Sequence, residues 1–205
     1  SSNNEKLNWD TIKLSIDGAI IRIGYGSDIE SQDDSQAIRN MRECERLGIP
    51  YGVYIYSYCL NIEEVRSEAA HILRMIQGFN PALGVWFDME DADGYKRNHG
   101  LVPEQNGELL TDFCVEFMQI VKDAGYKTGV YANWNYFNNI LDDDRLANFD
   151  GFNRWLAHWG IDDPSMDCLL WQYTSDGYIK GVSYYTETPV YDDNGVPTGE
   201  TITEL

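Results

Sequence analysis

Short apolar runs alternate with amphipathic stretches along most of this chain, which predicts strands alternating with helices. The runs that predict strands lie at 18–24, 51–58, 83–89, 127–132, 154–158 and 169–173. Amphipathic helices are predicted over 34–47, 62–76 and 107–124, each followed by a glycine that favours a helix end. Residues 91–105 are predicted to form a loop, and a further short strand is expected at 181–185.

Strands that alternate with helices predict an α/β fold with a parallel sheet, because parallel strands need helical crossovers. About five strand–helix units come first, and the later strands follow one another without a long helix between them. This order favours a small, closed or nearly closed barrel over a doubly wound sheet. We expect a single domain over 1–185, and an extended arm or hairpin over 186–205 that leads toward a possible further module.

Composition narrows the range of partners. The chain has 205 residues, of which 43% are hydrophobic, and its net charge is -19. Nucleic acid is disfavoured as a partner, because phosphate backbones are bound by basic surfaces. No apolar run approaches the roughly 18 residues of a membrane helix, so membrane insertion is not expected. A neutral or cationic ligand, or a sugar polymer, fits this charge better.

Neither the cysteines nor the histidines have the spacing of a metal site. They are Cys44, Cys59, Cys114 and Cys168, and His71, His99 and His158. Free cysteine packs as a small hydrophobic residue, so we expect buried free thiols. The sequence predicts no metal and no cofactor.

The stretch 85–91 is the strongest candidate for chemistry. An apolar run ends there in two carboxylates, Asp88 and Glu90. If the run is a strand, alternation puts both on one face, roughly 6.6–7 Å apart along the backbone. Two acids on one face repel, so one tends to keep its proton near neutral pH. Cleavage of a glycosidic bond uses such a pair, although a strand that simply ends in an acidic turn gives the same pattern.

Aromatic and amide side chains gather at the predicted strand ends. They are Tyr54, Tyr56, Tyr131, Trp134, Trp171 and Gln172. Aromatic rings stack on the apolar faces of sugars, while phenols and amides bind hydroxyl groups. Each ring alone is equally typical of core filling. Together with a carboxylate pair at the carboxyl ends of parallel strands, they favour a sugar-binding groove.

Six segments, in order, resemble the family-25 glycoside hydrolases. They are 19–26 (AIIRIGYG), 51–54 (YGVY), 87–90 (FDME), 129–132 (GVYA), 155–157 (WLA) and 170–173 (LWQY). The resemblance runs to about Ser183 and implies a (β/α)5β3 barrel. It also implies a lysozyme that cuts the β-1,4 bond between N-acetylmuramic acid and N-acetylglucosamine of bacterial peptidoglycan.

The resemblance also suggests roles for individual residues. Glu90 matches the general acid of the family, and Asp88 matches the acid that assists it. We expect Asp88 to stabilise the charge that develops on the sugar or to orient the substrate's N-acetyl group, with a nucleophilic role as the alternative. Tyr54 and Tyr131 match groove residues.

Two further acids of the family have no clear match. The first is expected about two positions before Ser1, which would leave the first strand of the barrel missing or truncated in this chain. The second is expected after the last matched strand, where Asp192 or Asp193 is the candidate; Glu187 or a residue beyond Leu205 are alternatives.

The family also implies a setting. We expect a monomer that acts on bacterial peptidoglycan, either extracellular or associated with the cell wall, and secreted or released by a phage. A barrel that binds wall glycan without cutting it is the second hypothesis. An unrelated α/β enzyme with a coincidental acid pair is the third.

Overall fold

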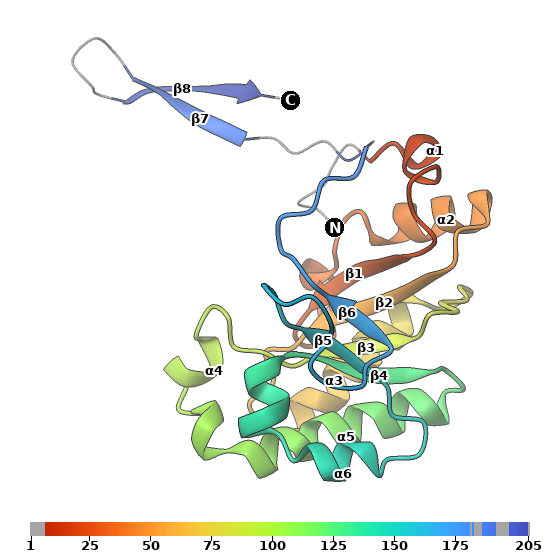
Figure 1. Ribbon diagram of the computed structural model, residues 1–205, viewed down its shortest axis with the longest axis vertical. Helices are drawn as coiled ribbons and strands as arrows, with labels where there is room; N and C mark the ends of the chain where they lie inside the picture. The colour runs from red at the N-terminus through yellow and green to blue at the C-terminus, as the bar shows by residue number, and fades with distance from the viewer. Residues whose placement is uncertain (1–6, 181, 183–185, 192–196, 205) are drawn as a thin grey trace.

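The computed structural model describes residues 7–180, 182, 186–191 and 197–204. Six parallel strands form one curled sheet, and they follow one another across it in chain order. These strands are β1 (Ala19–Tyr25), β2 (Tyr51–Tyr56), β3 (Val85–Asp88), β4 (Thr128–Asn133), β5 (Arg154–Ala157) and β6 (Leu170–Gln172). The predicted α/β fold with a barrel-type sheet is therefore confirmed as a half-barrel (Figure 1).

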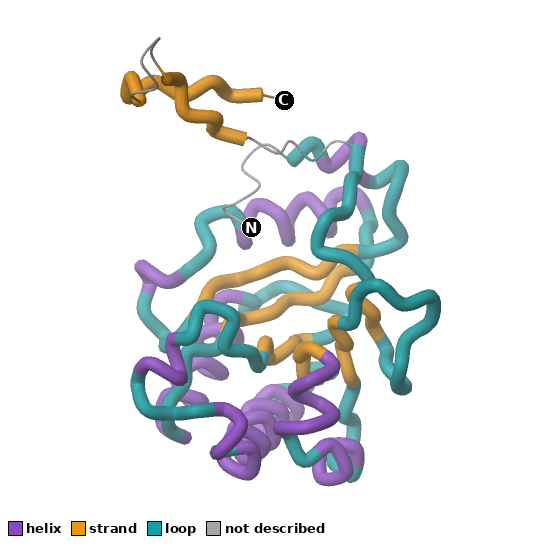
Figure 2. Tube along the Cα trace, turned by 60° about the vertical axis from the view of Figure 1, so that its left-hand side comes forward, coloured by secondary structure: helices purple, strands orange, loops and turns teal. Residues whose placement is uncertain are grey.

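Helices cover the outer face of this sheet (Figure 2). The helices are α1 (Trp9–Ile12), α2 (Ala37–Leu47), α3 (Ile62–Met75), α4 (Tyr95–Asn98), α5 (Gly107–Asp123) and α6 (Asp143–Ala147), and those that pack on the strands are α2, α3 and α5. Short 3-10 turns lie at Glu30–Gln32 and Pro103–Gln105, and a π-helix lies at Tyr136–Ile140. Helix α2 packs on β1, while α5 packs on β3 and β4. Within the described part of the chain, no helix is both long and apolar enough to cross a bilayer.

Side chains of the strands alternate between the helical layer and the inside of the curled sheet. Phe87 points outward and stacks on Phe117 of α5, with ring centroids 4.2 Å apart. Its neighbour Trp86 points inward and contacts the ring of Trp155 at 5.9 Å. This alternation gives the strands a buried apolar outer face and an aromatic inner face. The four cysteines are free as expected; three are buried and Cys168 is half-buried.

The prediction of a plain loop over 91–105 is wrong in part, because α4 and a 3-10 turn lie within it. The Asp91 carboxylate accepts the backbone N–H groups of Lys96 and Arg97, at 2.7 and 3.2 Å. Gly94 has φ +72°, which favours glycine, and precedes the helix. These local contacts give the segment a helical turn that hydrophobic periodicity does not reveal.

Residues 186–204 contain a second, two-stranded sheet. Strand β7 (Thr186–Tyr191) pairs antiparallel with β8 (Pro197–Glu204). A hairpin was one of the two forms expected for this segment. Apart from Val182, the strand expected at 181–185 lies outside the described residues, as do the candidate acids Asp192 and Asp193.

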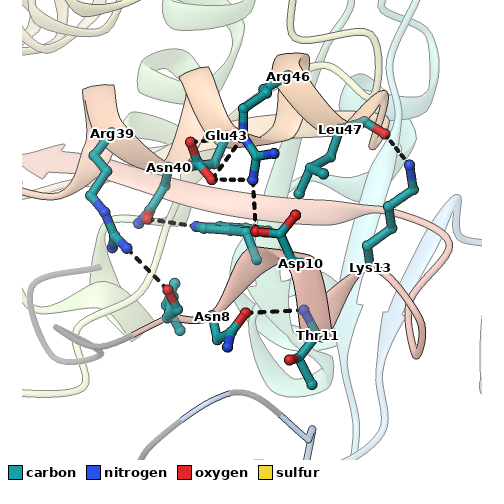
Figure 3. Close-up of polar contacts among 11 residues, drawn as sticks. Asn8, Asp10, Thr11, Lys13, Arg39, Asn40, Glu43, Arg46 and Leu47 are labelled. Atoms are coloured by element: carbon teal, nitrogen blue, oxygen red, sulfur yellow. Dashed lines mark hydrogen bonds and ion pairs between the residues drawn. The ribbon is translucent and has the colours of Figure 1, made fainter.

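Helix α1 is held on α2 by polar contacts near the surface (Figure 3). The Trp9 indole N–H donates to Oδ1 of Asn40 at 3.0 Å. Arg46 of α2 forms an ion pair with Asp10 at 2.9 Å. The side chain of Asn8 caps α1 by accepting the N–H of Thr11. Trp9 is the buried anchor of this contact, and the ion pair lies at its rim.

Candidate active site

The two acids lie at the carboxyl end of β3. Asp88 is the last residue of the strand, and its sheet neighbours are Tyr56 of β2 and Tyr131 of β4. The backbone ladder continues one residue further, because the N–H of Met89 donates to the carbonyl of Tyr131 at 2.9 Å. Glu90 follows directly. Asp88 is only 5% exposed, whereas Glu90 is half-buried, so Glu90 is the member of the pair that solvent reaches.

Burial raises the pKa of Asp88 well above its usual value, and the charge of Glu90 raises it further. One of its oxygens, Oδ1, is buried and has no hydrogen-bond partner within the described residues. Burial also raises the pKa of Glu90. A hydrogen bond between the two carboxyl groups raises the pKa of Asp88 and lowers that of Glu90. Both carboxyl groups therefore have raised pKa values, Asp88 more strongly than Glu90, which favours retention of a proton by the pair near neutral pH.

A buried lysine lies beneath the pair. Lys96 of α4 is 1% exposed, and its ammonium group donates to the backbone carbonyls of Ser57 and Glu90, the latter at 2.9 Å. Its positive charge lowers the pKa of both Asp88 and Glu90, against the effect of burial. The sequence analysis missed this residue, because it lies in the segment predicted as a loop and only its burial distinguishes it.

A wall of rings follows the inner face of the sheet beside the acids. Trp155 of β5 lies at its centre, with ring-centroid distances of 5.7 Å to Tyr54 and 4.6 Å to Tyr131. The Tyr131 hydroxyl donates to Oε1 of Gln172 at 2.7 Å. Burial, and then the charge of Asp88, raises the pKa of Tyr54 to about 12. The structure therefore brings together predicted site residues from four strands: Tyr54 of β2, Asp88 of β3, Tyr131 of β4 and Gln172 of β6.

Trp155 is a ring that the sequence analysis did not assign to the site. It occupies the position beside Tyr131 in the sheet register, just as Tyr131 lies beside Asp88. The alternation of inward and outward side chains along β5, aligned with that of β4, was the signal that could have identified Trp155. Neighbouring parallel strands in register place their inward-pointing side chains in one row across the sheet.

The remaining predicted site residues are Tyr56, Trp134 and Trp171, and they lie in different places. Tyr56 is the sheet neighbour of Asp88, and burial, followed by the charge of Glu90, raises its pKa. Trp134 lies against the ring of His158, at 5.6 Å. Trp171 is the sheet neighbour of Leu156, whereas Gln172 is that of Ala157, so Trp171 lies on the opposite face from Gln172. Its indole N–H donates to the backbone carbonyl of His158 at 2.8 Å, and the structure does not bring it to the acids.

A hollow of about 420 Å³ lies beside Tyr56, the sheet neighbour of Asp88, although neither acid of the pair is among its lining residues. It is lined by Arg22, Tyr25, Tyr56, Tyr58, Ala92 and Asp93. Within the described residues, no group of histidine, cysteine and carboxylate side chains has the arrangement of a metal site. The groups at hand are two coupled carboxyls of unequal exposure and several aromatic rings, which can transfer a proton and bind a sugar ring.

A carboxyl pair at the carboxyl edge of a curled parallel sheet, faced by aromatic rings, is the arrangement of a glycoside hydrolase. Residues 1–182 match the family model described as Glycosyl hydrolases family 25, and the chain belongs to this family.

Known relatives agree with this assignment. The lysozyme of Streptococcus phage Cp-9 is 34% identical over 91 residues, which are 39% of this chain and 26% of that protein. The lysozyme of Streptococcus phage Cp-7 is 28% identical over 145 residues, covering 65% of this chain and 38% of that protein. The chain thus spans about a quarter to two-fifths of the length of these curated relatives.

Solved structures show the same fold. The modular autolysin LytC from Streptococcus pneumoniae, in complex with a synthetic peptidoglycan ligand, has a TM-score of 0.72 at 26% identity, covering 90% of this chain and 43% of that chain. The catalytic domain of endolysin ply40 from bacteriophage P40 of Listeria monocytogenes has a TM-score of 0.71 at 23% identity, covering 90% of this chain and 86% of that chain. The second likeness shows the fold alone.

Proposed function

We propose that this protein is a peptidoglycan hydrolase that cleaves the β-1,4 bond between N-acetylmuramic acid and N-acetylglucosamine. The observation that carries the proposal is the position of Asp88 and Glu90 at the carboxyl edge of the sheet, beside a wall of tyrosine and tryptophan rings. The lysozymes of Streptococcus phages among its relatives support the same reaction.

In the proposed mechanism, Glu90 protonates the leaving glycosidic oxygen, because it is the acid that the substrate can reach. A proton held by Asp88 passes to Glu90 through the hydrogen bond between them. Asp88 is then ionised when positive charge develops on the sugar. Its carboxylate stabilises that charge or orients the substrate's N-acetyl group for attack at the anomeric carbon.

Burial argues against Asp88 as the nucleophile. A nucleophilic carboxylate must contact the anomeric carbon directly, and Asp88 is 5% exposed. Assistance by the substrate's own N-acetyl group needs only a nearby charge or hydrogen bond. The aromatic row formed by Tyr54, Tyr131 and Trp155 supplies surfaces for the sugar rings.

The setting proposed for this activity is the bacterial cell wall. Peptidoglycan is the partner, and the protein acts as a monomer outside the cell or after release by a phage. The division into a catalytic barrel over 1–185 and an arm over 186–205 belongs to the same proposal, as does a third acid at Asp192 or Asp193.

The substitution Glu90→Gln tests the assignment. We expect turnover of purified cell walls, measured as new reducing ends, to fall about 10²- to 10⁴-fold, because the general acid is lost. The far-ultraviolet circular dichroism spectrum should not change. Glu104→Gln is the matched control, since Glu104 is exposed and pairs with Arg97. Unchanged turnover in Glu90→Gln would contradict the proposal, and wall binding by the wild type without reducing ends would favour a glycan-binding barrel.

A further inference from the structure

A second hollow continues from the one beside Tyr56. Its volume is about 450 Å³, and its walls include Tyr25, Gln32, Tyr58, Glu68, Asp93 and Tyr95. Three of these residues, Tyr25, Tyr58 and Asp93, also line the hollow beside Tyr56. The two hollows are therefore neighbours, and a substrate that occupies the first can extend a side group into the second.

A buried carboxyl group with a free oxygen lines this second hollow. Glu68 of α3 is 1% exposed. Its Oε1 accepts the backbone N–H of Tyr58 at 2.7 Å, but its Oε2 is buried with no hydrogen-bond partner within the described residues. Oε1 of Gln32, another residue that lines the hollow, also lacks a partner among the described residues. Buried acceptors of this kind are rarely left unsatisfied in native proteins, so a ligand that donates hydrogen bonds fits this place.

Aromatic rings and a second carboxylate surround the same space. The ring of Tyr58 meets those of Tyr25 and Tyr95 nearly at right angles, with centroids 5.7 and 4.8 Å apart. The Tyr58 hydroxyl donates to Asp93 at 2.6 Å, and this hydrogen bond lowers the pKa of Asp93. Of the described residues, no lysine or arginine lines the hollow. Ring faces and carboxylates attract a cation; Lys96, whose charge lowers the pKa of both Glu68 and Asp93, lies outside the lining of the hollow.

We propose that this hollow binds a primary ammonium group carried by the peptide part of the peptidoglycan substrate. A primary ammonium group has three N–H donors, which can satisfy the free oxygens of Glu68 and Gln32 while the positive charge lies among the tyrosine rings. A quaternary ammonium group fits less well, because it donates no hydrogen bond. The identity of the ligand as a wall peptide rests on the proposed function, whereas the preference for an ammonium group rests on the hollow alone.

A binding measurement with a short peptide tests this inference without any glycosidic cleavage. The probe is an N-terminally acetylated tripeptide, alanine–lysine–alanine amide, titrated onto the full chain by calorimetry. The comparison probe is the same peptide with its lysine side chain acetylated. We expect the free amine to bind at least tenfold more tightly than the acetylated peptide. Glu68→Gln and Asp93→Asn should each reduce that preference to less than threefold, while the control Glu63→Gln, an exposed acid on the same helix, should retain it.

Equal binding of the two peptides by the wild type would overturn the inference, as would a full preference in both Glu68→Gln and Asp93→Asn. Because Glu68 is buried, its variant is accompanied by a thermal unfolding curve, and Asp93→Asn, at an exposed position, decides the matter if Glu68→Gln does not fold. Glu90→Gln should lose cleavage but keep the peptide preference. Failure of the hydrolase proposal therefore shows in reducing ends, and failure of this inference shows in peptide binding.

Discussion

The contacts between α1 and α2 and those beneath the acid pair use the same residue types in opposite surroundings. Arg46 and Asp10 pair with side chains that are 48% and 70% exposed (Figure 3). Lys96 and Asp88 are 1% and 5% exposed. Water screens the attraction between Arg46 and Asp10 and hydrates each of them if the other is removed. Lys96 and Asp88 are shielded from water, so neighbouring protein groups must stabilise their charges. We therefore expect exposure, rather than the number of charged contacts, to decide how much each region contributes to the free energy of unfolding.

Lys96→Met should have the largest effect. It leaves the carbonyls of Ser57 and Glu90 without their donor and removes the positive charge that opposes burial of Asp88 and Glu90. Removing one partner of a buried charge group costs about 3–5 kcal/mol of unfolding free energy, which urea titration measures. The pKa values of both acids should rise, so the pH optimum of wall hydrolysis should move to higher pH.

The matched control is Lys122→Met, because Lys122 lies near the surface and pairs with Asp150, whose side chain is 95% exposed. Its urea midpoint and pH optimum should equal those of the wild type. If the two lysine variants behaved alike, burial would not be the factor that separates the two regions.

Glu68 should give the next largest effect, as a dependence of stability on pH. Burial raises the pKa of Glu68 from 4.5 to about 7. The folded state therefore holds this proton more tightly than the unfolded state. The resulting contribution is complete below pH 4.5 and is lost as pH rises through 7, by about 3 kcal/mol. Glu68→Gln should flatten the change in unfolding free energy between pH 4.5 and 8, as measured by urea titration across that range.

Asp33 should change the free energy of unfolding with pH in the opposite direction. A hydrogen bond from Arg74 lowers the pKa of Asp33, so its contribution is present above the unfolded pKa and is lost as pH falls. Asp33→Asn should therefore lower the free energy of unfolding more at neutral pH than at acidic pH, the opposite direction to Glu68. An unchanged slope in Glu68→Gln would mean that another group titrates in this range.

The comparison also shows what the sequence can predict. The strands were predictable because their outward residues, such as Phe87, are part of long apolar runs. The position of Asp88 and Glu90 followed, since a strand that ends in acids brings them to the carboxyl edge. The face of each side chain was harder to predict in the short strand β6. Trp171 and Gln172 were both expected in the groove, but Trp171 lies on the face opposite Gln172. A one-residue difference reverses the face of a side chain.

Lys96 and Glu68 show the limit of that reasoning. Lysine and glutamate on a helix are normally solvated, and neither residue breaks the amphipathic or loop pattern around it. They become buried because α3 and the turn that contains α4 pack against the carboxyl edge of the sheet, where their partners are the backbone groups of Ser57, Tyr58 and Glu90. Such partners come from distant parts of the chain, and periodicity carries no information about them.

Arg46→Ala should have the smallest effect, and it completes the comparison from the exposed side. Arg46 pairs with Asp10 of α1 and also with Glu43 on its own helix. All three side chains contact water, so each is hydrated once the pair is broken. At low salt we expect a slightly lower urea midpoint for the variant, and in 0.5 M NaCl the two midpoints should coincide, because salt screens exposed charges. A difference that persists in high salt would show that Arg46 stabilises α1 by packing rather than by charge.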